Sequence, residues 1–537
     1  MTSAFYHWPL LLRDALKRDW RLLTLWVIGL AAFAGGFVPA FTAIGKGDGL
    51  VAFYETMKNP AMVAITGPTS VKTAADYTVG AMYSQTMLLY SALIAAIVAA
   101  LFVVAHTRRE EEQGLSEYLC SFQLGRQAGL LALAVELLIV HVLLALAICG
   151  LMMAFGEDSM PAEGCLLFAL GVSLGGLLGG AMAAFFAQLV PTASAASGAS
   201  LAVIGALYLL RALSDIASES LSRVNPLGSL VYTYPFTENA RVPLVWPLLA
   251  MGILLALAFL LQGRRDFGSA YFYGRAAKGL GCFSPQSAAG LLVRLNCGTM
   301  LAWLATLAIL GAAYGSIYGD MEKFLNSSPL VQALFAVQGQ SPEEAFTATI
   351  LVVLMGVAAI LPVVVVNKLC SEEAAGHLVQ LLATRTSRRK LYVSALALAV
   401  ACAVAGCLLA AASLGAVGIA SMQQTSLTLQ AVVLAGLNVL PAMLVVLGLA
   451  AVLCGFRPRL RLLSYCYLVY AFMLAYFQQL LDLPTWLNRT SVFTWLPEMP
   501  LADFDGRTWS GMLALAMLLM ITGGIGYERR DFRENET

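Results

Sequence analysis

The feature that most constrains this chain is a series of long apolar runs, each about as long as a membrane-spanning helix. A helix needs about 20 apolar residues to cross a hydrocarbon core of about 30 Å. The twelve runs lie at residues 21–43, 79–106, 128–155, 164–190, 194–213, 242–262, 300–318, 345–367, 391–418, 428–455, 460–481 and 508–526. Only 12% of the 537 residues are charged, against about 25% in soluble domains. We therefore predict an all-α polytopic membrane protein with twelve transmembrane helices.

Lysine and arginine are distributed unevenly between the segments that connect these runs. With both termini inside, the inner segments carry 23 of the 32 basic residues. The outer segments carry nine, together with 17 of the 31 acidic residues. Because short cytoplasmic loops are enriched in Lys and Arg, we expect a multi-pass protein of the cell membrane with both termini cytoplasmic.

The polar residues exclude several kinds of function. The charges cancel to a net charge of +1, which indicates no nucleic-acid partner. The ten cysteines are scattered, mostly within apolar runs, and show no CxxC or Cys/His spacing. We interpret them as small apolar residues rather than as a disulfide framework or a metal site. No metal ligands and no catalytic residues are predicted.

Two repeated short sequences divide the twelve runs into two sets of six. The sequence RRDF at residues 264–267, after the sixth run, recurs at residues 529–532 after the twelfth. The pattern EE with a following glycine at residues 110–114 recurs at residues 372–376. An even number of spans gives both halves the same orientation, so we predict two parallel six-helix repeats.

This duplication also predicts the domain organisation. Residues 1–20 are expected to form an amphipathic interfacial helix and residues 21–275 the first six-span half. Residues 276–299 are expected to be a cytoplasmic linker that could include an interfacial helix, and residues 300–537 the second half.

The segments between the second and third spans of each half are predicted to dock on another protein. In the first docking segment, residues 107–127, Leu115, Leu119 and Phe122 fall on one helix face. The second docking segment, residues 371–390, repeats the plan. A solvated charged loop is the alternative, and the repetition favours docking. The predicted docking residues are Arg108, Arg109, Glu110, Glu111, Gly114, Leu115, Leu119, Phe122, Arg126, Glu372, Glu373, Gly376, Leu378, Leu381, Leu382 and Arg388.

The order of these features resembles the permeases of ABC-2 type exporters, most closely the fused twelve-span permeases of tetronasin and multidrug exporters. The resemblance rests on the E-E-x-x-G segment with its apolar helix and basic stop, supported by the RRDF run, and covers nearly the whole chain. The sequence SFQL at residues 121–124 departs from the Leu-Leu-x-(Thr/Ser)-Pro type of run usual there. The sequence LLAT at residues 381–384 is closer to that run.

The resemblance implies a transport subunit rather than an enzyme. The chain has no G-x-x-x-x-G-K-[ST] sequence, and its longest predicted cytoplasmic segment, about 263–299, is too short for a nucleotide-binding domain. A separate ABC ATPase, in two copies per permease, would then hold ATP and Mg²⁺ and engage the docking segments. No cofactor is expected in this chain itself.

Charged and aromatic residues within the spans are candidates for a substrate path. Charges in a span are costly and therefore functional candidates by default, although a buried polar contact between helices is the alternative for Glu136 and His141. For the aromatic residues the alternative is packing or lipid contact. The predicted path residues are Glu136, His141, Tyr83, Tyr90, Tyr467, Tyr470, Met473 and Phe477.

Together these features predict an ATP-driven exporter of small hydrophobic or amphipathic compounds, of antibiotic or multidrug type. The competing interpretation is an ion- or proton-coupled secondary transporter. The Gly-x-x-x-Asp-Arg-x-Gly-Arg-Arg type of motif that such carriers often hold after the second span is not matched at residues 106–110. A membrane-embedded transferase is a third interpretation, for which the outer loops are short and poor in catalytic groups.

Overall fold

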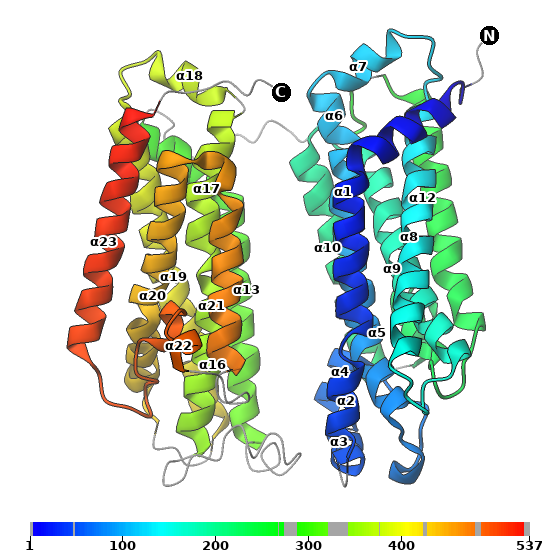
Figure 1. Ribbon diagram of the computed structural model, residues 1–537, viewed down its shortest axis with the longest axis horizontal. Coiled ribbons are helices and arrows are strands. Elements are labelled where there is room, and N and C mark those ends of the chain that lie inside the picture. Colours follow the sequence, from blue (N-terminus) through cyan, green and yellow to red (C-terminus); the bar gives the residue numbers. More distant parts are fainter. Residues whose placement is uncertain are drawn as a thin grey trace. The chain divides into compact units, whose positions relative to one another are not determined.

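The computed structural model divides the chain into two compact units, Met1–Ala277 and Lys278–Thr537. It describes residues 4–46, 49–58, 60–217, 219–266, 268–272, 287–320, 342–374, 376–422, 427–477 and 485–530. Within these ranges the regular elements are helices, and no strand occurs (Figure 1).

Unit 1 contains six long helices joined by short ones. The long helices are α1 (Trp8–Gly35), α5 (Val79–Ala105), α8 (Ala128–Ala154), α9 (Ala162–Leu189), α10 (Ala193–Ala217) and α12 (Val245–Arg264). The short helices are α2 (Val38–Ile44), α3 (Gly49–Met57), α4 (Pro60–Thr66), α6 (Arg108–Glu112), α7 (Leu115–Cys120) and α11 (Glu219–Val224).

Unit 2 has a similar order of long and short helices. The long helices are α13 (Ala288–Ser316), α16 (Pro342–Ala358), α17 (Ile360–Ala374), α19 (Arg388–Ser421), α20 (Leu429–Phe456), α21 (Leu462–Phe477) and α23 (Gly506–Arg529). The short helices are α18 (His377–Leu382) and α22 (Thr485–Asn488).

Eleven helical stretches in the described residues are long and apolar enough to cross a membrane. They coincide with eleven of the twelve predicted spans. The remaining prediction, residues 460–481, falls on α21, which has 16 residues in the described part of the chain; residues 478–481 lie outside that part. Since a span needs about 20 residues, the twelve-span arrangement stays a prediction.

Small residues let the long helices approach closely. On α9, a Cβ atom added at Gly179 would lie 2.3 Å from the carbonyl oxygen of Ala96 on α5. In unit 2, a Cβ atom at Gly315 of α13 would lie 2.8 Å from the carbonyl oxygen of Leu414 on α19. Close backbone approach through glycine and alanine is typical of helices that associate in lipid, where burial of apolar side chains supplies no driving force.

The starts of α1 and α13 can be compared with the predicted domain boundaries. The helix that contains the first predicted span begins before residue 21, because α1 is continuous from Trp8. Figure 1 shows its first turns bent away from the axis of the rest. Where the span itself begins stays a prediction. The predicted linker likewise overlaps α13, which begins at Ala288, while residues 273–286 lie outside the described part of the chain.

Candidate functional site at the arginine end of each unit

Each docking segment contains a glycine that turns the chain between two helical pieces. Gly114, with φ 74°, separates α6 from α7, and Gly376, with φ 76°, precedes α18. A left-handed backbone is costly for residues with a side chain and free for glycine. The predicted single amphipathic helix is therefore broken at Gly114, and α7 ends at Cys120, so that Phe122 follows the helix rather than lying on it.

In unit 1, the glutamate of the docking segment binds the arginine that follows the last long helix. Arg265 donates to both oxygens of Glu111, at 2.8 Å from Nη1 to Oε1 and 2.8 Å from Nη2 to Oε2. The Glu111 and Arg265 side chains are only 7% and 5% exposed. A bidentate pair of this kind combines charge with fixed geometry. We call the end of each unit that carries this arginine the arginine end.

Further donors and acceptors surround the Glu111–Arg265 pair. The amide of Gly268 donates to Glu111 Oε1 at 2.7 Å, and Arg108 Nη1 donates to Glu111 Oε2 at 2.9 Å. Arg108 is buried and also donates from Nε to the carbonyl of Pro191, at 3.0 Å, just after α9. The carboxylate thus joins the docking segment to Arg265 and Gly268 after α12, and Arg108 of the same segment extends the network to the residue Pro191 after α9.

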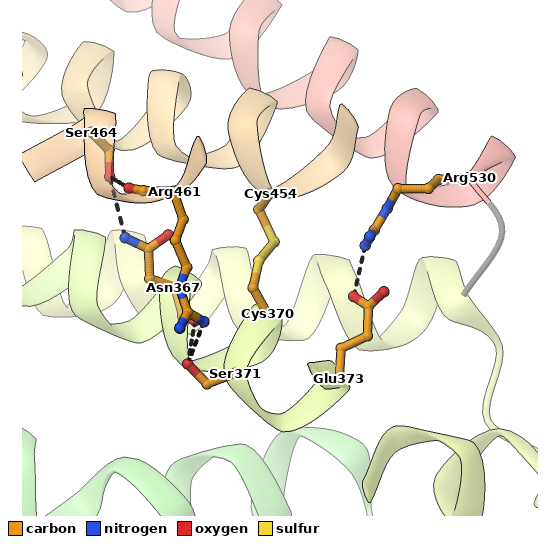
Figure 2. The surroundings of a disulfide bond; sticks show 8 residues. All are labelled: Asn367, Cys370, Ser371, Glu373, Cys454, Arg461, Ser464 and Arg530. Carbon is orange, nitrogen blue, oxygen red and sulfur yellow. Dashed lines mark hydrogen bonds and ion pairs between the residues drawn. A yellow bond between two sulfur atoms is a disulfide. The ribbon is translucent and has the colours of Figure 1, made fainter. Parts of the chain in front are cut away.

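In unit 2 the same pair recurs, with a single hydrogen bond to the glutamate from the residues that the structure describes. Arg530 Nη2 donates to Glu373 Oε2 at 2.7 Å (Figure 2). Glu373 is the counterpart of Glu111, and Arg530 follows α23 as Arg265 follows α12. The Arg530 side chain is 20% exposed, four times the fraction of Arg265.

A second contact between the same segments also occurs in both units. Arg126, at the end of the first docking segment, donates to the carbonyl oxygen of Arg265. Arg388, its counterpart, donates to the carbonyl oxygen of Arg530 at 2.7 Å. In each unit, both ends of the docking segment are therefore tied to the residue that terminates the last long helix.

The interpretation of all ten cysteines as small apolar residues is wrong for one pair. Cys370 and Cys454 form a disulfide with their Cα atoms 6.2 Å apart (Figure 2). They lie near the ends of α17 and α20, 84 residues apart in the chain, so no local spacing could reveal that these helix ends meet. Arg108 stands in unit 1 where Cys370 stands in unit 2, at the offset of 262 residues that relates the docking segments.

The predicted apolar faces of the docking segments differ in exposure. In the first, Leu115 and Leu119 are exposed, as are Phe122 and the neighbouring Tyr118. In the second, Leu378 is buried against residues of α13 and α19, including Leu292 and Leu391, while Leu381 and Leu382 are half-buried. The remaining docking residues are arranged around the pairs: Arg109 is exposed, Glu110 lies 3.1 Å from Arg18, and Glu372 lies 2.7 Å from His377.

The predicted path residues do not form one group. Glu136 is buried beside a cavity of unit 1. His141 packs edge-on against Trp26 and donates from Nδ1 to the Leu137 carbonyl. Tyr83 is buried and donates to the Ala34 carbonyl at 2.9 Å, and Tyr90 is half-buried.

The path residues on α21 lie in unit 2. Tyr467 and Tyr470 bind the carbonyl and hydroxyl oxygens of Thr490, and Tyr470 and Met473 are exposed. The Phe477 side chain lies outside the described part of the structure. An exposed tyrosine and methionine on a membrane helix suit contact with lipid or with another apolar surface.

The arginine partners of the two glutamates were not predicted from the sequence. Glu111 and Arg265 belong to the two repeated patterns, but nothing local joins residues 154 positions apart. A signal was present: both patterns recur with nearly equal offsets, as expected for two groups that keep one contact in each half.

An all-helical, multi-pass membrane protein with paired charged sites at the helix ends fits the permease class of proteins. Comparison with known proteins agrees. Residues 286–528 match the family described as "Multidrug efflux system permease Rv1217c, C-terminal domain". The chain is also 28% identical over 528 residues to the multidrug efflux system permease protein Rv1217c of Mycobacterium tuberculosis, covering 97% of this chain and 95% of that protein. This similarity supports a transport role, as a permease rather than an enzyme.

Proposed function

We propose that this chain is the transmembrane subunit of an ATP-driven exporter of the ABC-2 type. Two parallel six-helix halves, with both termini cytoplasmic, would sit in the cell membrane. They would move small hydrophobic or amphipathic compounds out of the cell. The observation that carries the proposal is the duplicated link between docking segment and last long helix, made by Glu111 with Arg265 and by Glu373 with Arg530.

The link has the properties that mechanical coupling requires. A buried, hydrogen-bonded charge pair is costly to break, because separation leaves both charges desolvated and unpaired. A force on the first docking segment is therefore transmitted to the end of α12, and a force on the second to the end of α23. The paired contacts of Arg126 and Arg388 with the same helix ends reinforce this connection.

The ATPase would be a separate protein, in two copies, one for each docking segment. The exposed side chains of Leu115, Tyr118, Leu119 and Phe122 offer an apolar face to such a partner. ATP and Mg²⁺ would bind on the partner, whose closure would pull or push the docking segments.

A proton- or ion-coupled secondary transporter is the second candidate. The observation that favours it is Glu136, a buried carboxylate with no hydrogen-bond partner in the described part of unit 1. Such a group could carry a proton or a cation across part of the membrane. This candidate gives the docking segments no partner, so the two proposals differ in what they require of those segments.

Reconstitution separates these candidates. The chain is co-expressed with each ABC ATPase of its source organism, and any complex is measured by native mass spectrometry against the 57.1 kDa of the chain alone. The complex is then placed in proteoliposomes and tested for transport with ATP, and with a proton gradient in the absence of ATP. We expect two ATPase copies and transport that needs ATP.

The docking surface is tested in the same system. Leu119→Glu should weaken ATPase binding at least tenfold, because it places a charge in the proposed contact. Val242→Glu is the matched control, since Val242 is an exposed apolar residue before α12, at the opposite end of that helix from Arg265. Transport that runs on a proton gradient without any ATPase would reject the exporter proposal in favour of the secondary transporter.

A further inference from the structure

Unit 1 contains a cavity of about 430 Å³ at its arginine end. Leu11, Asp14, Ala15 and Arg18 of α1 line one side, and α8 lines the other. Residues of α6 and α7, including Glu110 and Leu119, complete the wall. Pockets for drug-sized molecules typically measure about 300–1,000 Å³, so the cavity is large enough for such a ligand.

The face of α8 toward the cavity explains why space remains there. Gly129, Ala132, Leu133 and Glu136 all line the cavity, and their spacing places them on one helix face. A Cβ atom added at Gly129 would meet no atom within 4 Å. Two small residues thus leave room between the start of α8 and the first turns of α1.

Glu136 is a buried acid of this cavity whose carboxylate is left without a partner. Its side chain is 1% exposed, and neither carboxylate oxygen has a hydrogen-bond partner among the described residues. A buried charged group without a partner is costly. Its retention in the wall of a cavity therefore points to a partner that comes from outside the chain.

Apart from Asp14, which is exposed, the other charged groups of the cavity are already engaged. Arg18 lies 3.1 Å from Glu110 and 3.1 Å from Asp19, and His106 lies 3.2 Å from Asp19. Arg265 is held by Glu111, and Arg126 by the carbonyl oxygen of Arg265. The cavity therefore presents paired cations, the exposed carboxylate of Asp14, and the buried carboxylate of Glu136, which has no hydrogen-bond partner among the described residues. It favours a ligand with positive charge.

The apolar part of the wall determines the rest of the ligand. Leu11, Leu119, Leu130 and Leu133 line the cavity together with Ala132. Among the described residues, no group of three or more His, Cys, Asp or Glu side chains is arranged to hold a metal ion. An organic cation, in contrast, can bury apolar surface against these aliphatic side chains. Aliphatic walls, together with the buried carboxylate of Glu136 that no arginine pairs with, suit a bulky monovalent cation.

We propose that this cavity binds amphipathic organic monocations, with Glu136 as the counter-charge. Cations of this kind would be one substrate class of the transporter. That assignment rests on the proposed function, whereas binding of the cation to the cavity does not. Glu111 and Arg265 line the cavity and also form the pair that links the first docking segment to the end of α12. A cation bound in the cavity would therefore contact that link directly. Unit 2 has Leu398 at the position that corresponds to Glu136, so the site belongs to unit 1.

The test measures binding of radiolabelled tetraphenylphosphonium to the purified chain in lipid nanodiscs without any ATPase, with empty nanodiscs subtracted. Glu136→Gln should weaken binding at least tenfold, and Glu136→Asp should stay within about threefold of the unaltered protein. Glu163→Gln is the matched control: Glu163 is an exposed glutamate, paired with Arg241, elsewhere in unit 1. It should leave binding unchanged.

Two additional measurements keep the test decisive. Tetraphenylborate has the same shape and the opposite charge, so it should bind at least tenfold more weakly than tetraphenylphosphonium. Gly129→Phe should block the cavity without altering Glu136, and it covers the case in which Glu136→Gln fails to fold. The proposal is overturned if Glu136→Gln or Gly129→Phe binds tetraphenylphosphonium like the unaltered protein, or if tetraphenylborate binds equally well. Since no ATPase is present, neither result bears on whether transport requires ATP.

Discussion

The arginine ends of the two units hold the same glutamate–arginine pair in different surroundings. In unit 1, Glu111 accepts from Arg265, Arg108 and the Gly268 amide. In unit 2, Glu373 accepts one hydrogen bond within the described residues, from a more exposed arginine. The pair and its place on the last long helix are common to both units, and what supports the pair is specific to each.

A second difference concerns how neighbouring helix ends are joined. In unit 1, the Arg108 guanidinium reaches the Pro191 carbonyl just after α9. In unit 2, the corresponding residue is Cys370, and it joins α17 to α20 through the disulfide with Cys454. The two units thus meet a similar need with a network of hydrogen bonds in one case and a covalent bond in the other.

The largest expected effect comes from removing the glutamate of each pair. Glu111→Gln should lower the free energy of unfolding by about 3–5 kcal/mol, because it leaves the buried Arg265 charge without its counter-charge. Glu373→Gln should cost about 1–3 kcal/mol, since a single contact is lost and Arg530 is closer to solvent. The measurement is chemical unfolding of each variant in the same detergent.

Glu163→Gln serves as the control for this comparison. Glu163 and Arg241 are 56% and 76% exposed, and an exposed pair contributes about 0–1 kcal/mol. Equal losses for Glu111→Gln and Glu373→Gln would show that the richer network of unit 1 adds nothing.

An intermediate effect on stability should distinguish α7 in the first docking segment from α18 in the second. Leu378→Ala should destabilise by about 2–3 kcal/mol, because Leu378 is buried against α13 and α19 and its loss leaves a cavity. Leu119→Ala should change stability by less than about 0.5 kcal/mol, since Leu119 is 38% exposed. Thermal unfolding of both variants checks the difference. A large loss for Leu119→Ala would mean that this face already packs inside the protein and is not free for a partner.

The smallest effect should be equal in the two units. Gly114→Ala and Gly376→Ala should each cost about 1 kcal/mol, because alanine is strained in the left-handed region. A Cβ atom at either glycine meets nothing within 4 Å, so no steric term is added. Unequal losses, again measured by chemical unfolding, would show that the two turns are not equivalent.

The features predicted from sequence are those that depend on nearby residues. Hydrophobic length located eleven stretches that are long and apolar enough to cross a membrane. Repeated short patterns located the two segments that hold Glu111 and Glu373, whose docking role stays a prediction. The pairing of Glu111 with Arg265 and the disulfide depend on helices that are distant in the chain. Helix packing decides such contacts, and local hydropathy carries no information about it. The end of α7 at Cys120 was not predicted for another reason: the apolar spacing of Leu115, Leu119 and Phe122 suits a helix longer than the chain forms.

The candidate path residues also show which features local sequence predicts and which depend on helix packing. The cost of a charge within a span singled out both Glu136 and His141. Only the structure separates them, since Glu136 lines the cavity and His141 packs against Trp26. Residues five positions apart lie about 140° apart around a helix and therefore meet different neighbours.

The central claim is that the two glutamate–arginine pairs transmit motion from the ATPase to the permease. The most direct measurement is the ratio of compound transported to ATP hydrolysed, in proteoliposomes, for the Glu111→Gln/Glu373→Gln double variant with its ATPase bound. We expect complex formation to be retained and the ratio to fall at least tenfold, with Glu163→Gln unchanged. A double variant that keeps both the complex and the unaltered ratio would contradict the claim.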